Sequence, residues 1–472
     1  MAGIVSYGAH IPLYRLSLSE VNRAWGKSAG MGERAIANWD EDSLTMGVEA
    51  ATDCLKSMDR ELVDALYFAS TTPVYREKQT ASILAAVIDL KSKIFAVDIT
   101  DSLRSATAAM KSALDAVSAG PTRMALVVAS DLRIPPPNSV FETNLGDGAA
   151  ALLLGKDNVI AEIEGSYAVS SNFIDIWKRD EDTYIRTWED RFVNEEGYMK
   201  ILPQAVSGLM AEHNLTPKDF DRAIFQAPDI RNHQRMARKL GFDIKDQVQD
   251  PLFTTVGNTG TSSVPMMLVA TLEVAKPGDR LLLANYGDGA DAYILRITDR
   301  IEKLKNRRGV KRNLESKMMI PNYGKYIQFR NLMKWEEAPG EVQTSSLNIL
   351  WRDRKWVFSG KGQRCRACGH IQYPMQRICM WCQAKDNFDE VRLAEEKGTL
   401  YTFSMDERAP VIDLPNVISV VDLECGGRIY SSMTDRDPNK LEVGMPMELT
   451  FRKLHEGNGF HNYFWKTRPV RG

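Results

Sequence analysis

Four cysteines within eighteen residues place the strongest constraint on how this chain can fold. Cys365, Cys368, Cys379 and Cys382 form the pattern C-x2-C-x10-C-x2-C. Two CxxC pairs at this spacing can bind one tetrahedral Zn²⁺ through four thiolates. Because four cysteine ligands leave no coordination position open, the pattern predicts a structural zinc ion and not a catalytic one. Cys54 is the one cysteine in the first 364 residues, which limits the thiol chemistry open to that large region.

The composition argues against several classes of partner. Apolar residues make up 44% and charged residues 26% of the 472 residues, as in a globular protein of several domains. A formal net charge of −2 gives no electrostatic basis for binding nucleic acid or an anionic membrane. No apolar run approaches the roughly 20 residues of a membrane span, and the N-terminal segment lacks the regions of a signal peptide. These features predict a cytoplasmic protein without a nucleic-acid or membrane partner.

The first 300 residues alternate between strand-like and helical patterns. Short apolar runs typical of strands buried on both faces occupy residues 64–70, 93–99, 124–130, 150–155, 222–228 and 279–287. Amphipathic helical patterns lie between them at 43–58, 80–90 and 105–120. The alternation predicts a largely parallel α/β core. The sequence GDGA occurs at 146–149 and again at 287–290, which suggests an internal duplication.

The remaining sequence predicts three further parts. We expect the α/β domain to cover residues 1–336 and an acidic, polar linker to occupy residues 337–347. The cysteine pattern then falls in a zinc ribbon at 348–390. From 391 to 472, short strand-like runs alternate with Gly, Asp and Pro turns, which is typical of a small closed β-barrel such as an OB-fold.

Three segments of the first domain match a known family. They are GIVSYGAHIPLYRLS near the start, VGNTGTSSVPMMLVATLEVAKPGDRLLLANYGDGADAY at 256–293, and YGKYIQFRNLMK at 323–334. With them the domain resembles the thiolase superfamily, specifically its archaeal-type 3-hydroxy-3-methylglutaryl-CoA synthase branch. The resemblance implies a duplicated βαβαβ core, a homodimer formed through this domain, and activity on acyl-CoA thioesters.

The C-terminal part matches a second family. RCRACGHIQYPMQRICMWC, GTLYTFSMDERAP, NVISVVDLECGG and LEVGMPMELTF are similar to the zinc-ribbon and OB-fold proteins that accompany such enzymes. The resemblance implies a role in handling acyl-CoA. Many OB-folds bind oligonucleotides, but this barrel segment is not strongly basic and a fold alone does not fix function. We therefore expect no nucleic-acid partner.

The catalytic positions depart from the family pattern. The family uses a cysteine nucleophile at the N-terminus of a buried helix, where the helix dipole stabilises the thiolate. In VDITDSLRSATAAM that position falls on Leu103. The family's general-acid glutamate falls on Thr71 and its histidine on Gln226, whereas the asparagine of GNT is retained as Asn258. Cys54 lies in another helical pattern and is expected to be a small core residue, so we expect no acyl-enzyme.

A pocket of this kind without a nucleophile can still make or break a carbon–carbon bond by aldol chemistry. Cleavage needs a base for the β-hydroxyl proton and donors for the thioester enolate. Thiolase-like aldolases that pair with a zinc-ribbon and OB-fold partner, as in steroid side-chain degradation, are similar, and the resemblance implies tyrosines in place of cysteine. The candidate groups are Tyr286, Asp288, Asn258, Tyr75 and Asp101.

Other residues are assigned by their position in helical or loop patterns. Arg235 and Lys239, in IRNHQRMARKLGF, are candidates for contacts with CoA phosphates, although such a helix face is commonly solvated. His233 of the same pattern is expected to face solvent. Residues 166–200, rich in aromatic and acidic side chains, are expected to cover the pocket.

Two alternatives to an aldolase remain open at this point. A Claisen-type condensation could use a substitute nucleophile, for which Ser102 is the candidate. A non-catalytic thiolase-like scaffold could instead channel acyl-CoA between partners. Since aldol addition and cleavage share a transition state, the sequence predicts neither the direction of the reaction nor the acyl chain.

Overall fold

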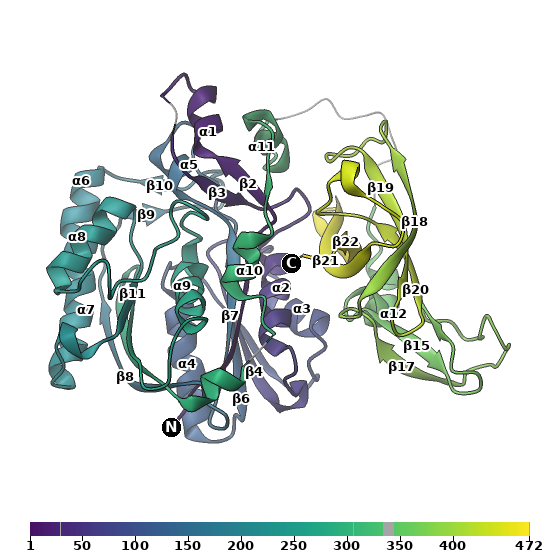
Figure 1. The fold of residues 1–472 in the computed structure, drawn as a ribbon, viewed down its shortest axis with the longest axis horizontal. Coiled ribbons are helices and arrows are strands. Elements are labelled where there is room, and N and C mark those ends of the chain that lie inside the picture. Colours follow the sequence, from purple (N-terminus) through teal and green to yellow (C-terminus); the bar gives the residue numbers. More distant parts are fainter. Residues whose placement is uncertain (29, 305, 334–343, 472) are drawn as a thin grey trace. The chain divides into compact units, whose positions relative to one another are not determined.

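The computed structural model describes residues 1–28, 30–304, 306–333 and 344–471. The chain forms two compact units (Figure 1). The first contains Met1–Ala37, Asp42–Ala85 and Leu90–Tyr326, and the second contains Asn38–Glu41, Ala86–Asp89 and Ile327–Gly472. Of the expected linker at 337–347, residues 337–343 lie outside the described residues, and Leu347 already begins a helix, α12 (Leu347–Val357).

The first unit is built on a nine-stranded mixed sheet. Its strand order is β11–β12–β13–β8–β1–β7–β6–β4–β5. The strands are β1 (Gly3–His10), β4 (Val63–Ala69), β5 (Phe95–Ile99), β6 (Met124–Asp131), β7 (Gly148–Gly155), β8 (Ala161–Ser170), β11 (Arg222–Phe225), β12 (Arg280–Tyr286) and β13 (Gly289–Ile297).

The expectation of a largely parallel core is wrong for most of this sheet. The parallel pairs are β4 with β5, β4 with β6, and β11 with β12, and they lie toward the two ends. The other five neighbouring pairs are antiparallel. The physical reason is that β6 with β7 and β12 with β13 are consecutive strands paired directly, whereas parallel neighbours need a crossover connection.

The strand order confirms the internal duplication. Strands β1, β7, β6 and β4 repeat the order and pairing of β8, β13, β12 and β11, and the two halves meet where β1 pairs with β8. Each GDGA motif leads into the corresponding strand, because β7 begins at Gly148 and β13 at Gly289. Gly289 has a φ of +126°, and a Cβ there would lie 2.0 Å from the carbonyl oxygen of Val169, so only glycine fits this turn.

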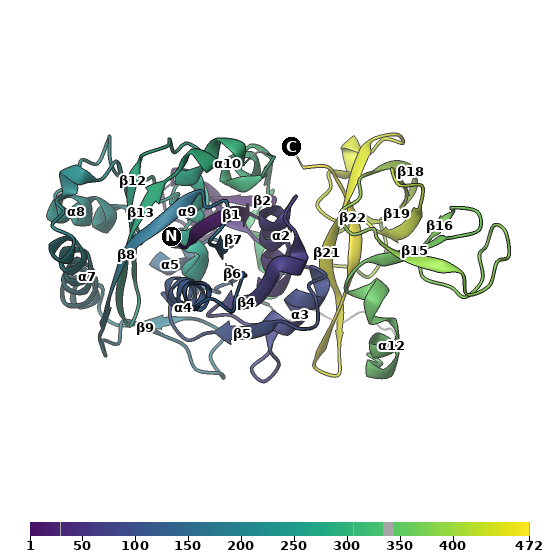
Figure 2. The same cartoon turned by 90° about the horizontal axis from the view of Figure 1, so that it is seen from below.

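Helices cover and fill the sheet in layers (Figure 2). Helices α4 (Ser105–Ala119) and α9 (Ser263–Leu272) lie between the strands of the two halves, α2 (Ser43–Leu55) covers one outer face, and α7 (Met199–Glu212) and α8 (Ile230–Leu240) cover the other. Nine of the ten α9 residues are buried, as expected for a helix that is apolar on every side. The smaller elements are α1 (Leu18–Ala24), β2 (Tyr14–Ser17), β3 (Glu33–Ile36), α3 (Thr80–Val87), α5 (Val140–Asn144), β9 (Ile176–Trp177), β10 (Arg186–Thr187), α6 (Asp190–Phe192), α10 (Gly309–Glu315), β14 (Met318–Met319) and α11 (Tyr323–Phe329).

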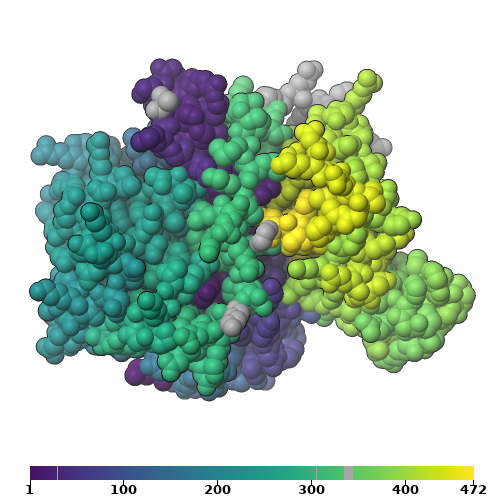
Figure 3. Space-filling model, in the orientation of Figure 1, coloured from purple at the N-terminus to yellow at the C-terminus, as the bar shows by residue number. Residues whose placement is uncertain are grey.

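The second unit contains a small ribbon and a β-barrel. The ribbon has the order β16–β15–β17, and the barrel has the order β20–β19–β18–β21–β22. In Figure 3 the ribbon forms the green lobe at the lower right of this unit. The strands are β15 (Lys361–Cys365), β16 (Ile371–Gln372), β17 (Phe388–Arg392), β18 (Gly398–Asp406), β19 (Asn416–Leu423), β20 (Arg428–Ser432), β21 (Pro446–Gly457) and β22 (Phe460–Pro469).

Contacts between the two edge strands close the barrel. Met433, just after β20, forms a bridge with Thr467 of β22. The Ser431 hydroxyl donates a hydrogen bond of 2.9 Å to the carbonyl oxygen of Trp465. Five strands closed in this way confirm the expected OB-fold. In the described part of both units, no helix is long and apolar enough to cross a bilayer.

Candidate functional site

A cavity of about 640 Å³ opens in the first unit. Its walls come from the loops that follow β4, β5, β6 and β12, together with residues 174–178 and Ile185. The carboxyl ends of the parallel strands β4, β5 and β6 lie at one edge of the sheet, where ligands of α/β proteins commonly bind. Residues 174–178 and Ile185 belong to the segment 166–200, so part of the segment that was expected to cover the pocket lines its wall.

The start of helix α4 brings Leu103 and Ser102 to the cavity wall. Leu103 therefore stands at the cavity with a side chain that cannot be acylated. The Ser102 hydroxyl donates to the carbonyl oxygen of Gly287 at 3.2 Å and accepts from the backbone N–H of Arg104 at 3.3 Å. Within the described residues, these partners of Ser102 include no side chain that could take its proton, which a serine nucleophile requires.

Asp101 and Asp288, two of the candidates from the sequence, both line the cavity. Both side chains are exposed, and both residues have a left-handed backbone, with φ of +73° and +48°. Asp101 accepts a hydrogen bond of 2.9 Å from the Thr100 hydroxyl. Left-handed backbone is uncommon outside glycine, although aspartate tolerates it better than most residues. Both carboxylates thus project from tight turns at the accessible rim.

Tyr286 lies behind the wall. It ends β12, is buried, and packs edge-to-face on Tyr198 with ring centroids 5.6 Å apart. Its hydroxyl donates a hydrogen bond to the carboxylate of Asp175, which does line the cavity. Burial, with a further effect of the Asp175 charge, raises the pKa of Tyr286 well above its usual value. Tyr286 is therefore a neutral donor that supports a wall carboxylate.

Asp175 is a site residue that sequence reasoning missed. It is half-buried, and its Oδ1 accepts a hydrogen bond of 2.6 Å from the backbone N–H of Ile176. Burial raises the pKa of its carboxyl, although the hydrogen bonds from Tyr286 and from Ile176 oppose this shift. The available signal was one acid within the apolar run NFIDIW. A carboxylate with a raised pKa in a cavity is a stronger base than an ordinary aspartate and is a candidate for proton transfer.

Two further candidates from the sequence, Asn258 and Tyr75, do not line the cavity. Asn258 is buried, donates to the carbonyl oxygen of Ala227 at 3.2 Å, and accepts from the backbone N–H of Gly260 at 2.9 Å. Its amide thus holds two backbone segments together. Tyr75 is half-buried in the loop after β4 and is not among the wall residues.

Thr71 and Gln226, which the resemblance assigns to two of the family's catalytic positions, differ in their access to the cavity. Thr71 lines it and donates its hydroxyl to Asp131 at 3.0 Å. Gln226 is buried directly after β11, and in the described part of the chain its Oε1 has no hydrogen-bond partner. Neither side chain is a general acid or base at neutral pH.

Arg133 is the second site residue that the sequence did not reveal. It follows β6, lines the cavity, and is only 4% exposed. Burial lowers the pKa of its guanidinium, and the charges of Asp131 and Asp175 oppose this shift. The available signal was a basic residue two positions after the end of a buried strand, in the sequence SDLR.

Helix α8 holds the residues proposed to meet CoA phosphates. Arg235 donates to Glu195 at 2.7 Å and to Asn232 at 3.0 Å, and Lys239 donates to the carbonyl oxygen of Met199 at 2.7 Å. Neither residue lines the cavity. Both basic groups are therefore already engaged by neighbouring residues.

His233 does not face solvent, so that expectation was wrong. Its ring is buried and lies against Phe225, with centroids 4.6 Å apart. Together with Met236, Ala237 and Leu240 it forms the buried face of α8 at helical spacing. Burial lowers the pKa of the imidazole to about 4, although the Asp250 charge opposes the shift.

Cys54 is a core residue, as expected. It is fully buried in α2, and burial raises the pKa of its thiol to about 12. A thiol with this pKa carries almost no thiolate at neutral pH and is not a nucleophile.

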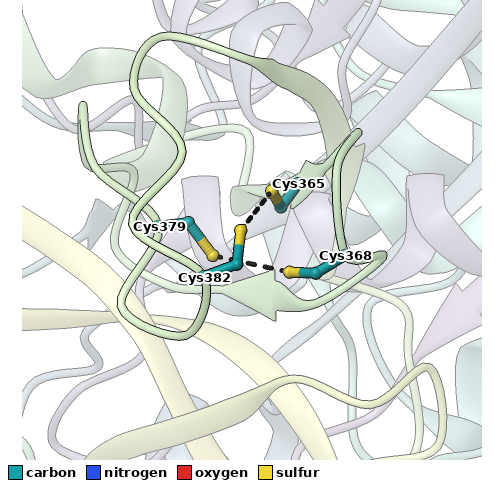
Figure 4. Close-up of side chains that lie close together, drawn as sticks. All are labelled: Cys365, Cys368, Cys379 and Cys382. Carbon is teal, nitrogen blue, oxygen red and sulfur yellow. Dashed lines mark hydrogen bonds between the residues drawn. The ribbon is translucent and has the colours of Figure 1, made fainter.

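The four ribbon cysteines converge on one point (Figure 4). Their sulfur atoms all lie within 4.8 Å of one another. Cys365 and Cys382 are 3.6 Å apart at sulfur, as are Cys368 and Cys379. Four sulfurs at these separations fit the tetrahedral ligand set of a structural zinc ion.

The two CxxC pairs are held by equivalent turns. The residue after each pair, Gly369 or Gln383, has a positive φ of +76° or +64°. The backbone N–H of Gly369 donates to the carbonyl oxygen of Cys365 at 2.8 Å, and that of Gln383 donates to the carbonyl oxygen of Cys379 at 3.0 Å. The two turns therefore present each pair of thiols in the same way, which is consistent with one shared metal ion.

Comparison with family models matches two parts of the chain. Residues 210–297 match the C-terminal part of 3-oxoacyl-[acyl-carrier-protein] synthase III, a thiolase-fold family. Residues 390–452 match the C-terminal OB-fold domain of ChsH2. The fold and these matches define a thiolase-like α/β core followed by a cysteine-bearing ribbon and an OB-fold domain.

Curated relatives narrow the family of the core. Hydroxymethylglutaryl-CoA synthase of Methanosphaera stadtmanae is 33% identical over 346 residues, which cover 71% of this chain and 99% of that protein. The enzyme of the same name from Methanocaldococcus jannaschii is 35% identical over 347 residues, covering 71% and 100%. The chain belongs to the hydroxymethylglutaryl-CoA synthase family.

Solved structures agree at the level of fold. An HMG-CoA synthase complexed with CoA has a TM-score of 0.65 at 18% identity, covering 73% of this chain and 94% of that one. PksG, an HMG-CoA synthase from Bacillus subtilis, has a TM-score of 0.63 at 18% identity, covering 70% and 89%.

Proposed function

We propose that this protein makes or breaks a carbon–carbon bond in a β-hydroxyacyl-CoA by aldol chemistry, without a covalent acyl-enzyme. The observation that carries the proposal is Leu103 at the cavity wall, because the resemblance assigns this residue to the position of the family's cysteine. The curated relatives are named hydroxymethylglutaryl-CoA synthase, and one structural neighbour contains CoA, which supports a CoA thioester as substrate. Aldol chemistry acts on the same class of substrate and does not need a cysteine nucleophile.

The cavity contains groups suited to each proton transfer. In the cleavage direction a carboxylate takes the proton from the β-hydroxyl, whose oxygen then forms a carbonyl as the bond between the α- and β-carbons breaks. The electron pair passes to the thioester as an enolate, which is protonated at the α-carbon, so no oxidant or water is consumed. Asp175 is the leading candidate for the base because burial raises the pKa of its carboxyl and Tyr286 orients it. Asp101 and Asp288 are candidates at the rim.

The other predicted groups keep supporting roles in this proposal. Asn258 fixes the GNT loop through its two backbone contacts, and Tyr75 remains a candidate from the loop after β4. Arg235 and Lys239 would have to exchange their present partners to reach CoA phosphates. Zinc in the ribbon is proposed as structural, because four thiolates occupy every position of a tetrahedral ion.

A homodimer through the first unit is also proposed. Strand β5 ends the nine-stranded sheet, and its free edge carries the apolar sequence FAVDI. Phe95 in this strand is 60% exposed. An exposed apolar edge strand favours pairing with another chain, and a second copy would extend the sheet.

The experiment that tests the aldol proposal is product analysis with the purified full chain. A panel of β-hydroxyacyl-CoAs is incubated with the protein, and small molecules are identified by mass spectrometry. We expect a carbonyl compound and a shortened acyl-CoA in equal amounts, or the addition product when these two are supplied. CoA thioester binding without turnover across the panel would favour the non-catalytic scaffold instead.

A further inference from the structure

We propose that Arg133 binds an anionic oxygen of the substrate inside the cavity, the carboxylate of a carboxylated acyl chain. The inference rests on the proposed acyl-CoA substrate but does not depend on turnover. Arg133 is 4% exposed and lines the cavity. Within the described residues its guanidinium has no hydrogen-bond or ion-pair partner. A buried guanidinium that is unpaired is strongly unfavourable unless a ligand neutralises it.

The two nearest carboxylates are committed to other donors. Asp131 accepts seven hydrogen bonds, from Ser70, from the backbone and hydroxyl groups of Thr71 and Thr72, and from Thr261. Asp175 accepts from Tyr286 and from the backbone of Ile176. Both charges act on Arg133 through space, but neither carboxylate lies within ion-pair distance of it. The donors of Arg133 therefore remain available to a ligand.

Local packing positions the stem of Arg133. Gly260 has a φ of +65°, and a Cβ at this position would lie 2.8 Å from Cδ of Arg133 and 2.4 Å from Oδ2 of Asp131. The absence of a side chain at Gly260 thus makes room for the stem of Arg133 beside the Asp131 network. A guanidinium on a buried stem has less freedom to lose on binding than an exposed one, and its planar fork matches the two-oxygen geometry of a carboxylate.

The surrounding wall indicates the rest of the ligand. Ile134, Ile174, Ile176, Ile185 and Trp177 line the same cavity. The wall also carries the carboxylates of Asp101, Asp175 and Asp288, of which Asp101 and Asp288 are exposed. The apolar side chains together with the buried cation fit an acyl chain that carries a carboxylate. The enolate oxygen of the thioester is the other anionic oxygen that the proposed reaction would place in this cavity, and the two sources can be separated by experiment.

The test compares two non-reacting probes on the full chain. Glutaryl-CoA carries a terminal carboxylate, and pentanoyl-CoA has a methyl group at the same chain length. We expect Arg133→Met to weaken binding of glutaryl-CoA about tenfold or more, as for loss of a charge-assisted hydrogen bond, and to leave pentanoyl-CoA within about twofold. Lys178→Met, which removes an exposed basic side chain of the same wall, is the matched control and should affect both probes equally.

If the two probes bind equally well, a second experiment tests whether Arg133 binds the enolate oxygen and not the acyl carboxylate. If Arg133 holds the enolate, Arg133→Met should lower kcat about 100-fold on a neutral-chain β-hydroxyacyl-CoA with little change in KM. Unchanged probe binding together with unchanged kcat would overturn the inference. So would unfolding of Arg133→Met, since removal of an unpaired buried charge should preserve or raise the melting temperature. Probe selectivity without turnover of any substrate would refute the aldol proposal and leave the carboxylate site intact.

Discussion

The hydroxyl of Tyr286 donates a hydrogen bond to the carboxylate of Asp175. One partner is a buried strand residue, and the other lines the cavity. The pair therefore links a fixed donor in the sheet to a group that can reach substrate. In the proposed mechanism the two residues have separate roles: Asp175 exchanges the proton, and Tyr286 positions its carboxylate.

This division makes a pH prediction for Tyr286→Phe. The hydrogen bond from Tyr286 lowers the pKa of Asp175, so its loss should raise that pKa further. The acidic limb of the kcat/KM profile, which reports the base in the free enzyme, should move to higher pH.

Removal of the proposed base is a separate test. Asp175→Asn should lower kcat by about 100-fold or more at every pH.

The matched control is Tyr198→Phe. Tyr198 packs on Tyr286 but donates its hydroxyl to the carbonyl oxygen of Gln226 at 2.8 Å. This variant should leave the acidic limb in place. Equal shifts in the two variants would show that general packing, and not the bond to Asp175, sets the profile.

The ribbon should depend on its four thiolates. Cys368→Ser removes one ligand, and we expect zinc content to fall well below one ion per chain and the ribbon to lose protection from hydrogen exchange. Cys425→Ser is the control, because Cys425 is a free cysteine outside the cluster. A folded Cys368→Ser protein that kept the wild-type exchange pattern but lost all turnover would contradict a purely structural metal.

His233 should make stability depend on pH. The folded pKa of about 4 lies below the ordinary value of 6.5, so protonation favours the unfolded chain, and stability is lost as pH falls through 6.5 toward 4. Linkage gives a loss of about 2 kcal/mol between pH 7.5 and pH 5 from this group. Urea unfolding at the two pH values should show this loss in wild type and its absence in His233→Phe. His213→Gln, at an exposed position, should behave as wild type; the same slope in His233→Phe would contradict the assignment.

The exposed edge strand β5 predicts a homodimer. Phe95→Asp places a charge on β5, and we expect a dimer to dissociate, as measured by light scattering after size-exclusion chromatography. Val274→Asp changes another exposed apolar residue of the first unit and should leave the dimer intact. A monomeric wild-type protein would rule out this interface.

Sequence alone predicted the regular elements well. The strands β4, β5, β6, β7, β11 and β12 were found because runs buried on both faces are continuous in sequence, whereas β8, with its half-buried alternating pattern, was missed. The metal ligands were found because their spacing is local. The antiparallel pairs were missed because a short apolar run carries no sign of its pairing direction. His233 was misassigned because its helical face is buried by other segments of the fold.

The candidate site was predicted only in part. The sequence predicted Leu103, Asp101 and Asp288 as site residues because they lie beside motifs that match the family. Arg133 and Asp175 belong to no motif, and only the three-dimensional fold brings them to one cavity. Asn258 carried a family precedent, yet its amide is engaged with the backbone.

The most direct test of the central claim is the intact mass of the protein during turnover. Full chain and acyl-CoA substrate are quenched in acid while product is forming, and the protein is weighed by mass spectrometry. Leu103→Cys, which places a thiol at the start of α4, serves to show that an adduct would be detected. We predict product formation with no added acyl mass on the wild-type chain. An acyl adduct that maps to Ser102 and is lost in Ser102→Ala together with activity would contradict the account and establish covalent catalysis.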